Sequence, residues 1–297
     1  MSVARHIKDA FRALGHQARV LSYELDWRVP AVAVAEVIQG RRWKAPDILD
    51  HLRGIIEARK VNLVLPFVDP AVELCARLKP LCPGVFIPVS DETLCHAMFD
   101  KFLAYRLFAE KGLPQPPLAG DTFPRIYKPR TGSASKGIIV ARSAREVPPH
   151  ICADDYQIQQ FVEDAREFTV DCYVRTDGEV LSVVPRERLE TAGGEAMRSI
   201  TVADPDLLAL SHRVLDALPL RGPVTLQFLR TPGGEYLLME INPRLGGGVV
   251  TGIGAGSRMP QMLAQETLGL KPEPFHDWVP GTLMTRYTQE IIFAPCR

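Results

Sequence analysis

The stretch at 236–248, Y-L-L-M-E-I-N-P-R-L-G-G-G, constrains the fold more than any other part of this sequence. Its first half has the composition of a β-strand. Because side chains alternate between the two faces of a strand, Glu240 and Asn242 are expected on the same face. Residues 223–230 predict a second strand, and the intervening T-P-G-G is typical of a tight turn. The two segments therefore predict an antiparallel hairpin.

The expected pairing of this hairpin brings a third polar residue to the same face. If residues 231–234 form the loop, Gln227 pairs with Leu238 and lies diagonal to Glu240, at roughly 7 to 8 Å between backbones. Together with Asn242, these residues would present three side-chain oxygens. Oxygen ligands without Cys or His suit a hard cation such as Mg²⁺, which shares its coordination shell with phosphates. A hairpin whose polar face is simply solvated is the alternative interpretation.

Composition indicates a soluble globular protein. The 297 residues are 46% hydrophobic, which is enough for a large core in two or three lobes. Thirty-five basic and thirty-five acidic residues cancel without a basic run, so neither nucleic acid nor an anionic membrane is an expected partner. No apolar segment approaches the length of a membrane span, and the six cysteines form no C-x-x-C pair. We therefore expect a cytoplasmic protein with reduced thiols.

The first ninety residues alternate between helices and strands. Helices are predicted at 3–15, 47–59 and 69–78, and strands at 18–23, 61–66 and 85–88. Such alternation is typical of a parallel sheet wound with helices. Because a unit of this kind normally opens with a strand, this lobe is expected to lack its first strand. Three explanations for the missing strand are expected. The true start lies upstream of Met1, a strand from elsewhere fills the gap, or the lobe is rearranged. We favour the upstream start.

The middle of the chain predicts a lobe boundary and a candidate phosphate-binding loop. Helices are expected after Asp91 and at 100–112, and the second is followed by a cluster of prolines that indicates a boundary. A strand at 124–129 then carries Lys128 into a loop of small residues at 130–137. Backbone N–H groups of such a loop can wrap phosphates while the lysine supplies a positive charge. The loop lacks the P-loop pattern, and an ordinary connection between strands is the alternative.

Two arginines in the second half are candidate substrate contacts. Arg186 and Arg188 precede a glycine-containing segment at 191–197, which is expected to be flexible. They could bind an anionic substrate, or form ordinary surface ion pairs. Glu167, at the start of an expected strand, could accept hydrogen bonds from ribose hydroxyls or be a charged turn residue. The remaining predicted elements are strands at 138–141, 156–162, 167–174, 180–185 and 281–287, and helices at 204–217 and 260–268.

Taken in order, five motifs resemble the ATP-grasp superfamily. They are D-K at 100–101, Y-K-P with its Gly/Ser loop, Q-Q-F-V-E-D-A-R-E-F-T-V-D, T-L-Q-F and M-E-I-N-P-R-L-G-G-G. The chain is most similar to the branch that contains the carbamoyl-phosphate synthase large subunit, biotin carboxylase and the pyrrolysine-biosynthesis ligase. The resemblance implies an α/β protein with an ATP-grasp fold, two α+β lobes clasping ATP, over residues 91–297. It also implies a small lid lobe at about 121–163 and a Rossmann-like pre-ATP-grasp lobe at 1–90.

Carried over residue by residue, the resemblance implies a nucleotide site and a metal site. The implied nucleotide contacts are Lys101, Lys128, Ser133, Ser135, Lys136, Gly137, Gln160, Phe161, Val162, Glu163, Glu167 and Leu229. The implied ligands of Mg²⁺, or of Mn²⁺ in its place, are Gln227, Glu240 and Asn242. Glutamine stands where many relatives have a carboxylate, which lowers the charge of the site by one. Lys128 and Arg244 are the implied catalytic residues, and the expected substrate contacts are Arg186, Arg188 and Arg244.

The resemblance implies the activity of an ATP- and Mg²⁺-dependent ligase. The protein could be a homodimer. It would join a carboxylate to an amine through an acyl phosphate and release ADP and phosphate. A carbamoyl-phosphate-synthase-like or carboxylase-like enzyme that uses bicarbonate is one alternative, and a catalytically silent ATP-binding regulator is another. Retention of Lys128, Glu240, Asn242 and Arg244 together argues against the silent regulator. The motifs do not encode the identity of the carboxylate or the amine.

Overall fold

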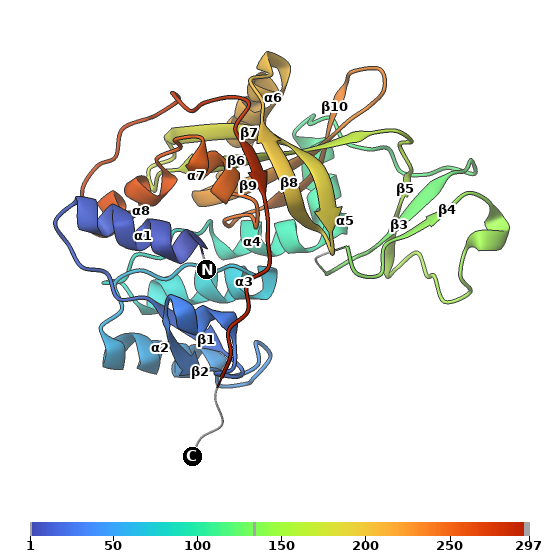
Figure 1. Ribbon diagram of the computed structural model, residues 1–297. Coiled ribbons are helices and arrows are strands. Elements are labelled where there is room, and N and C mark those ends of the chain that lie inside the picture. The colour runs from blue at the N-terminus through green and yellow to red at the C-terminus, as the bar shows by residue number, and fades with distance from the viewer. Residues whose placement is uncertain (1, 133–134, 294–297) are drawn as a thin grey trace.

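A six-stranded antiparallel sheet forms the centre of the computed structural model, which describes residues 2–132 and 135–293 (Figure 1). Its strands are β6 (Arg166–Val174), β7 (Val180–Ala192), β8 (Glu195–Thr201), β9 (Gly222–Arg230), β10 (Tyr236–Asn242) and β11 (Leu283–Thr285). They lie in the order β10-β9-β6-β7-β8-β11. No helix within the described residues is long and apolar enough to cross a bilayer.

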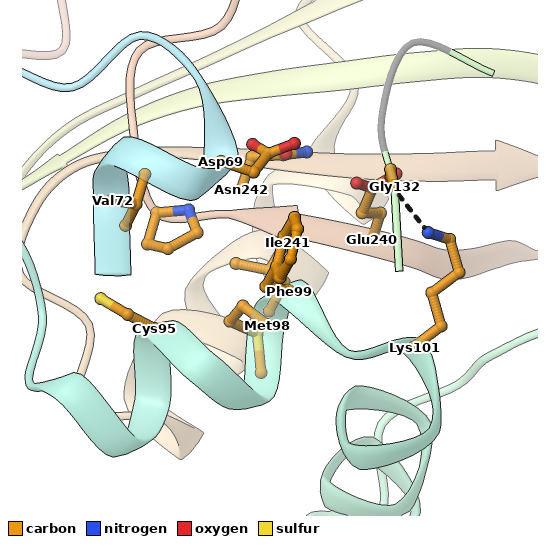
Figure 2. A pocket seen from close by; sticks show the side chains of 11 residues that line it. Asp69, Val72, Cys95, Met98, Phe99, Lys101, Gly132, Glu240, Ile241 and Asn242 are labelled. Carbon is orange, nitrogen blue, oxygen red and sulfur yellow. Dashed lines mark hydrogen bonds between the residues drawn. The ribbon is translucent and has the colours of Figure 1, made fainter. Parts of the chain in front are cut away.

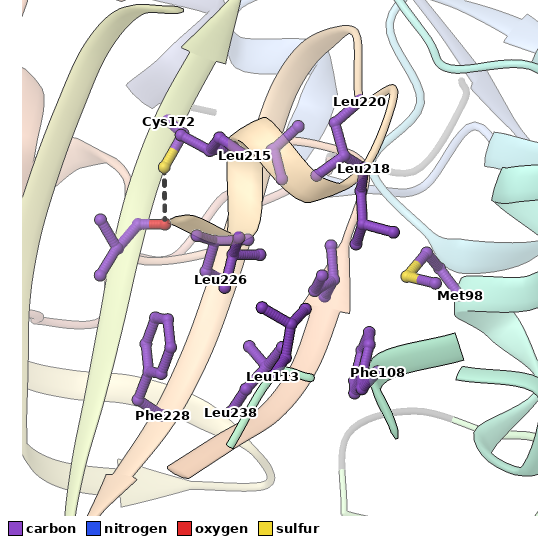
Figure 3. Close-up of a cluster of buried hydrophobic side chains, with 14 of the residues drawn as sticks. Met98, Phe108, Leu113, Cys172, Leu215, Leu218, Leu220, Leu226, Phe228 and Leu238 are labelled. Carbon is purple, nitrogen blue, oxygen red and sulfur yellow. Dashed lines mark hydrogen bonds between the residues drawn. The ribbon is translucent and has the colours of Figure 1, made fainter. Parts of the chain in front are cut away.

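One face of this sheet carries the main hydrophobic core (Figure 3). Alternate residues such as Val170, Leu226 and Phe228 are fully buried there, at 0% exposure. Three helices contribute to the same core: α4 (Glu92–Phe99), α5 (Lys101–Glu110) and α6 (Pro205–Ala217). Each large side chain buried in this layer contributes about 1.5 to 3 kcal/mol. The opposite face carries a second core, which includes Tyr173, Leu181 and Val184, and beside it the polar side chains of the candidate site.

The helices of this layer begin where the sequence predicts. Asp91 accepts a hydrogen bond from the Leu94 N–H at 2.8 Å and so caps α4. Asp100 accepts from the N–H groups at the start of α5 and pairs with Arg130 at 2.6 Å. Because Arg130 belongs to the loop after β3, this pair joins α5 to the small lobe. Side-chain caps of this kind satisfy backbone donors that have no partner within the helix.

The small lobe is a three-stranded antiparallel sheet at one end of the molecule (Figure 1). Its strands are β3 (Arg125–Pro129), β4 (Ile139–Ala141) and β5 (Tyr156–Gln160), in the order β4-β3-β5, with a short 3₁₀ helix, η3 (Ala144–Glu146). All three strands were predicted from the sequence within two residues of their ends. Lys128 lies on the central strand of this sheet and is 7% exposed.

The N-terminal lobe is split into two separate parallel pairs. Its elements are α1 (Ser2–Ala13), β1 (Leu21–Glu24), η1 (Pro30–Ala33), β2 (Glu36–Gln39), α2 (Ile48–Arg59), α3 (Asp69–Leu78) and η2 (Lys79–Leu81). Strands β1 and β2 pair in parallel. The strands expected at 61–66 and 85–88 reduce to one parallel bridge between Leu63 and Phe86. Within the described residues no strand joins the two pairs.

Helix α1 packs against the C-terminal half of the chain. Ile7, Ala10 and Phe11 form a small core with Ala264 of α8 (Met259–Thr267). A further short helix, α7 (Val250–Gly254), follows the glycine run and was not predicted. The N-terminal lobe is thus attached to the central sheet by apolar packing as well as through the chain.

Two predictions about the central sheet were wrong. The loop between β9 and β10 is one residue longer than expected, because Tyr236 pairs with Arg230, and a bulge follows between Leu238 and Glu240. The segment at 191–197 belongs to a hairpin, in which β7 and β8 are joined at Gly193 and Gly194. Both glycines have positive φ, at +57° and +78°, which suits a two-residue hairpin turn. The prediction of flexibility counted these glycines without recognising the turn.

A first prediction concerns Gly222, where β9 meets the N-terminal lobe. Its φ is +74°, and a Cβ there would lie 2.0 Å from the Pro88 carbonyl oxygen. Gly222→Ala should therefore lower the free energy of unfolding by more than about 1 kcal/mol in denaturant titration. Gly54→Ala, in the exposed part of α2 with no atom near its Cβ, is the control and should stabilise by about 0.5 to 1 kcal/mol. Equal stability of the Gly222 variant and the wild type would contradict the prediction.

Candidate active site

The register of the central sheet gathers the polar residues of four strands on one face. Glu240 stands opposite Gln227, and Asn242 opposite Thr225. On the next strand, Thr169 is opposite Gln227 and Glu167 is opposite Leu229. This face carries Glu167, Thr169 and Asp171 of β6, Arg186 and Arg188 of β7, Thr225, Gln227 and Leu229 of β9, and Glu240 and Asn242 of β10.

The three expected metal ligands are therefore neighbours. The bulge brings Glu240 directly opposite Gln227, rather than diagonal to it as expected from the sequence. The described residues contain no group of three or more His, Cys, Asp or Glu side chains that could hold a metal ion. A cation here would thus depend on the Gln227 and Asn242 amide oxygens beside one carboxylate. Such an all-oxygen set with a single negative charge fits Mg²⁺ that also binds phosphates.

Lys128 approaches the same face from the small lobe. Burial lowers the pKa of its ammonium group to about 8, and Lys101 adds to this effect, whereas the carboxylates of Glu240 and Glu167 oppose it. These three neighbouring charges are thus close enough to influence Lys128. A buried ammonium group beside the expected metal ligands can bind an anion at neutral pH, since most of it is protonated there.

Gly132, in the loop after β3, lies beside the candidate site (Figure 2). Lys101 Nζ donates to the Gly132 carbonyl oxygen at 3.1 Å, and both residues line a small pocket together with Glu240 and Asn242. Of the expected phosphate contacts in this loop, Ser135, Lys136 and Gly137 are exposed, and Ser133 lies outside the described residues. Ser135 and Gly137 have positive φ, at +56° and +74°, which is typical of tight turns.

The expected adenine-reading segment begins at Gln160, the last residue of β5. The Gln160 N–H donates to the Pro117 carbonyl and the Phe161 N–H to the Pro124 carbonyl, both at 3.0 Å. Glu163 pairs with Arg142. A base bound here would have to use other backbone groups of this segment, such as the carbonyl of Phe161 or the N–H groups of Val162 and Glu163.

Glu167 and Arg188 form an ion pair on the polar face. Arg188 Nη1 lies 2.9 Å from Glu167 Oε2, and Arg188 Nη2 donates to the Gly194 carbonyl at 2.7 Å. Burial lowers the pKa of Arg188 below its usual value. Glu167 is the more exposed partner, with 41% of its side chain accessible. A ribose could therefore reach the carboxylate of Glu167 beside Leu229 while Arg188 holds it.

Arg186 is much more deeply buried than a surface arginine. Its Nε lies 2.7 Å from Asp171 Oδ2, and the two side chains are 3% and 0% exposed. Its Nη1 has no hydrogen-bond partner within the described residues. A Cβ on Gly248 would lie 2.6 Å from the Arg186 Cζ, so the glycine run covers this guanidinium. Sequence reasoning missed Asp171, because nothing local distinguishes it within its strand.

Arg244 is anchored by a residue that the sequence analysis treated only as the start of a helix. Its Nε donates to Asp69 Oδ1 at 2.6 Å, and its Nη2 to Asn242 Oδ1 at 3.1 Å. The amide oxygen of Asn242 has a second lone pair, so this bond leaves it able to bind a cation. No sequence signal pairs Asp69 with Arg244, since 174 residues separate them.

Comparison with known proteins places this arrangement among similar folds. Residues 158–290 match a family model described as "ATP-grasp in the biosynthetic pathway with Ter operon". No curated protein sequence matches. Biotin carboxylase from Campylobacter jejuni is similar in structure, with a TM-score of 0.70 and 16% identity over 91% of this chain and 69% of that one.

Two further solved structures are similar over most of this chain. The biotin carboxylase domain dimer of Hydrogenobacter thermophilus 2-oxoglutarate carboxylase, in complex with MgADP, ADP and bicarbonate, has a TM-score of 0.73 and 14% identity over 94% of this chain and 70% of that one. N5-carboxyaminoimidazole ribonucleotide synthetase from Thermotoga maritima has a TM-score of 0.66 and 19% identity over 92% of this chain and 74% of that one. At these identities the likeness shows the fold.

A second prediction follows from the lowered pKa of Lys128. Inorganic tripolyphosphate, used as a probe, should bind less tightly as the pH rises through about 8, because the ammonium group then loses its proton. Calorimetric titration between pH 7 and 9 measures this change. Lys128→Arg, which stays charged, is the control and accounts for the titration of the probe itself. A ratio of the two dissociation constants that is independent of pH would contradict the prediction.

Proposed function

We propose that this chain, which has the ATP-grasp fold and the superfamily resemblance expected from its sequence, is an ATP-dependent ligase that joins a carboxylate to an amine. One observation carries the proposal. Gln227, Glu240 and Asn242 stand together on a sheet face that Lys128 approaches from the small lobe and Arg244 borders from its own loop. This combination of oxygen ligands with buried cations suits the transfer of a phosphoryl group.

In the proposed complex, ATP lies between the small lobe and the polar face of the central sheet. Lys101, Lys128 and the loop at 130–137 hold the phosphates, the segment at 160–163 reads the base, and Glu167 contacts the ribose. Gln227, Glu240 and Asn242 would hold Mg²⁺, which would offset the negative charge of the phosphates.

The proposed reaction needs no nucleophile from the protein. A carboxylate oxygen of the substrate attacks the γ-phosphorus, a C–O–P linkage forms, and the bond to the β-phosphate oxygen breaks to release ADP. The amine nitrogen then attacks the acyl carbon, the phosphate leaves, and the amine loses a proton as the amide bond forms. The protein contributes position and charge. Arg244 neutralises the phosphoryl group in transfer.

Arg188 is the proposed contact for the carboxylate substrate, and Arg186, which is buried on the same strand, is proposed to act on it through its charge. Arg188 lies at the edge of the polar face beside the tip of the β7–β8 hairpin. Arg186 retains an unpaired Nη1 beneath the glycine run. A carboxylate bound near Arg188 would receive a charge-assisted hydrogen bond. Bicarbonate is the second candidate for this role, and it is favoured by the bicarbonate complex of the similar H. thermophilus domain.

The direct test is an ADP-release screen of the purified protein with ATP, Mg²⁺ and pairs of amino acids as carboxylate and amine. Release that requires both members of a pair, with mass-spectrometric detection of their amide, supports the proposal. Release with bicarbonate alone would favour the second candidate. ATP binding without ADP release under any condition would indicate a silent regulator.

A third prediction tests the metal face. Glu240→Ala should lower kcat by more than the roughly 10- to 100-fold that loss of an outer-shell metal partner costs, while the thermal unfolding temperature stays close to that of the wild type. Glu235→Ala, an exposed acid in the turn of the same hairpin, is the matched control and should leave kcat unchanged. Wild-type turnover by Glu240→Ala would show that the site is assigned wrongly.

A fourth prediction concerns the substrate arginines. Arg188→Ala should raise the KM for the carboxylate by about tenfold or more, the equivalent of one charge-assisted hydrogen bond. The affinity for ATP should change less, and Arg186→Ala should have a weaker effect on KM. Arg198→Ala, on the neighbouring strand and exposed, is the control. An equal loss of ATP affinity in Arg188→Ala would make this residue a nucleotide contact acting through Glu167.

A further inference from the structure

A carboxylate of the N-terminal lobe holds the arginine that follows the central hairpin. Asp69, the first residue of α3, accepts a hydrogen bond from Arg244 Nε at 2.6 Å. Both side chains are largely buried, with 11% and 16% exposed. Asp69 also lines the small pocket that contains Glu240, Asn242 and Lys101 (Figure 2). The N-terminal lobe therefore reaches into the candidate active site through this residue.

The other hydrogen bonds of Arg244 do not fix its guanidinium as well as the bond to Asp69 does. Nη2 donates to Asn242 Oδ1 at 3.1 Å and Nη1 to the Leu245 carbonyl at 3.2 Å. Both acceptors are neutral and lie within three residues of Arg244 along the chain. Asp69 is its one acidic partner within residues 2–132 and 135–293. Since charge-assisted bonds are shorter and roughly twice as strong, Asp69 supplies the bond that decides where the guanidinium points.

The hydrogen bond between Asp69 and Arg244 also affects the balance of charge around the candidate site. The candidate site collects the cations of Lys101, Lys128 and Arg188 near the carboxylates of Glu240 and Glu167. A cation bound to the Asn242 amide would also repel the Arg244 guanidinium, which is hydrogen-bonded to the same group. A carboxylate 2.6 Å from Arg244 offsets this repulsion.

We propose that Asp69 is a positioning residue that orients Arg244 toward the reacting phosphoryl group, so that the N-terminal lobe completes the active site. This inference rests on the proposed function of Arg244. The competing interpretation is that the pair only fastens the N-terminal lobe to the central sheet. The two interpretations differ in what the loss of Asp69 does to turnover when the fold is intact.

The first test measures turnover and nucleotide binding in Asp69→Asn. Displacement of a group in an active site can cost on the order of 100-fold in rate, so a 10- to 100-fold fall in kcat is expected, with the dissociation constant for ADP within about twofold. Asp69→Glu should recover part of the rate. Glu92→Gln is the matched control, because Glu92 is also an acid in the first turn of a neighbouring helix but does not contact Arg244. A lower unfolding temperature with unchanged kcat would overturn the proposal.

The second test is a double-mutant cycle of Asp69→Ala and Arg244→Lys. If Asp69 acts through Arg244, its removal in the Arg244→Lys background should change kcat less than about threefold. Independent, multiplicative losses would overturn the proposal. The same four proteins are also titrated with inorganic tripolyphosphate, which reports the coupling without turnover. Failure of the proposed function would appear as absence of ADP release in the wild type, whereas failure of this inference would appear as a lack of coupling in that titration.

Discussion

Alternation of side chains along the strands of the six-stranded sheet is the constraint on which the rest of the structure depends. Residues such as Phe168, Val170 and Cys172 pack into the core with the helices, and the intervening Glu167, Thr169 and Asp171 face the candidate site. A shift of one residue in the register would exchange these two sets. Burial of the apolar face therefore fixes the position of the polar residues. The site is as rigid as the core because its side chains project from the same strands.

The buried pair of Arg186 and Asp171 explains the glycine run after Arg244. Removing two charges from water costs several kcal/mol per ion, so such a pair persists only with good geometry and close cover. A Cβ on Gly246 would lie 2.9 Å from Thr225 Oγ1, and one on Gly248 would lie 2.6 Å from the Arg186 Cζ. These two glycines leave no room for a side chain. In the structure they allow the backbone to lie directly over the polar face of the sheet.

Features that depend on local sequence were predicted well, and features that depend on distant partners were not. The caps at Asp91, Asp100 and Asp204 mark their helices because their side chains bond to backbone within three residues. The register of the central hairpin depends on a bulge that no local pattern indicates. The shared face of Gln227, Glu240 and Asn242 was nevertheless predicted correctly, because the longer loop and the bulge together shift the pairing by two residues and so preserve the face. The roles of the site residues come from the resemblance and remain predictions.

Three lobes of the chain supply the charges of the candidate site. Lys128 comes from the small lobe, Glu240 from the central sheet and Asp69 from the N-terminal lobe, so no single part holds a complete site. Lys128 and Arg244 differ in how their positive charges are balanced. Lys128 is partly deprotonated by burial and gains from an arriving anion, whereas Arg244 already has a carboxylate partner. An incoming triphosphate would therefore neutralise the positive charge that the small lobe contributes. The orientation of Arg244 is already set by the N-terminal lobe. Nucleotide affinity would then depend mainly on the small lobe, whereas contact with the terminal phosphoryl group would depend on the N-terminal lobe.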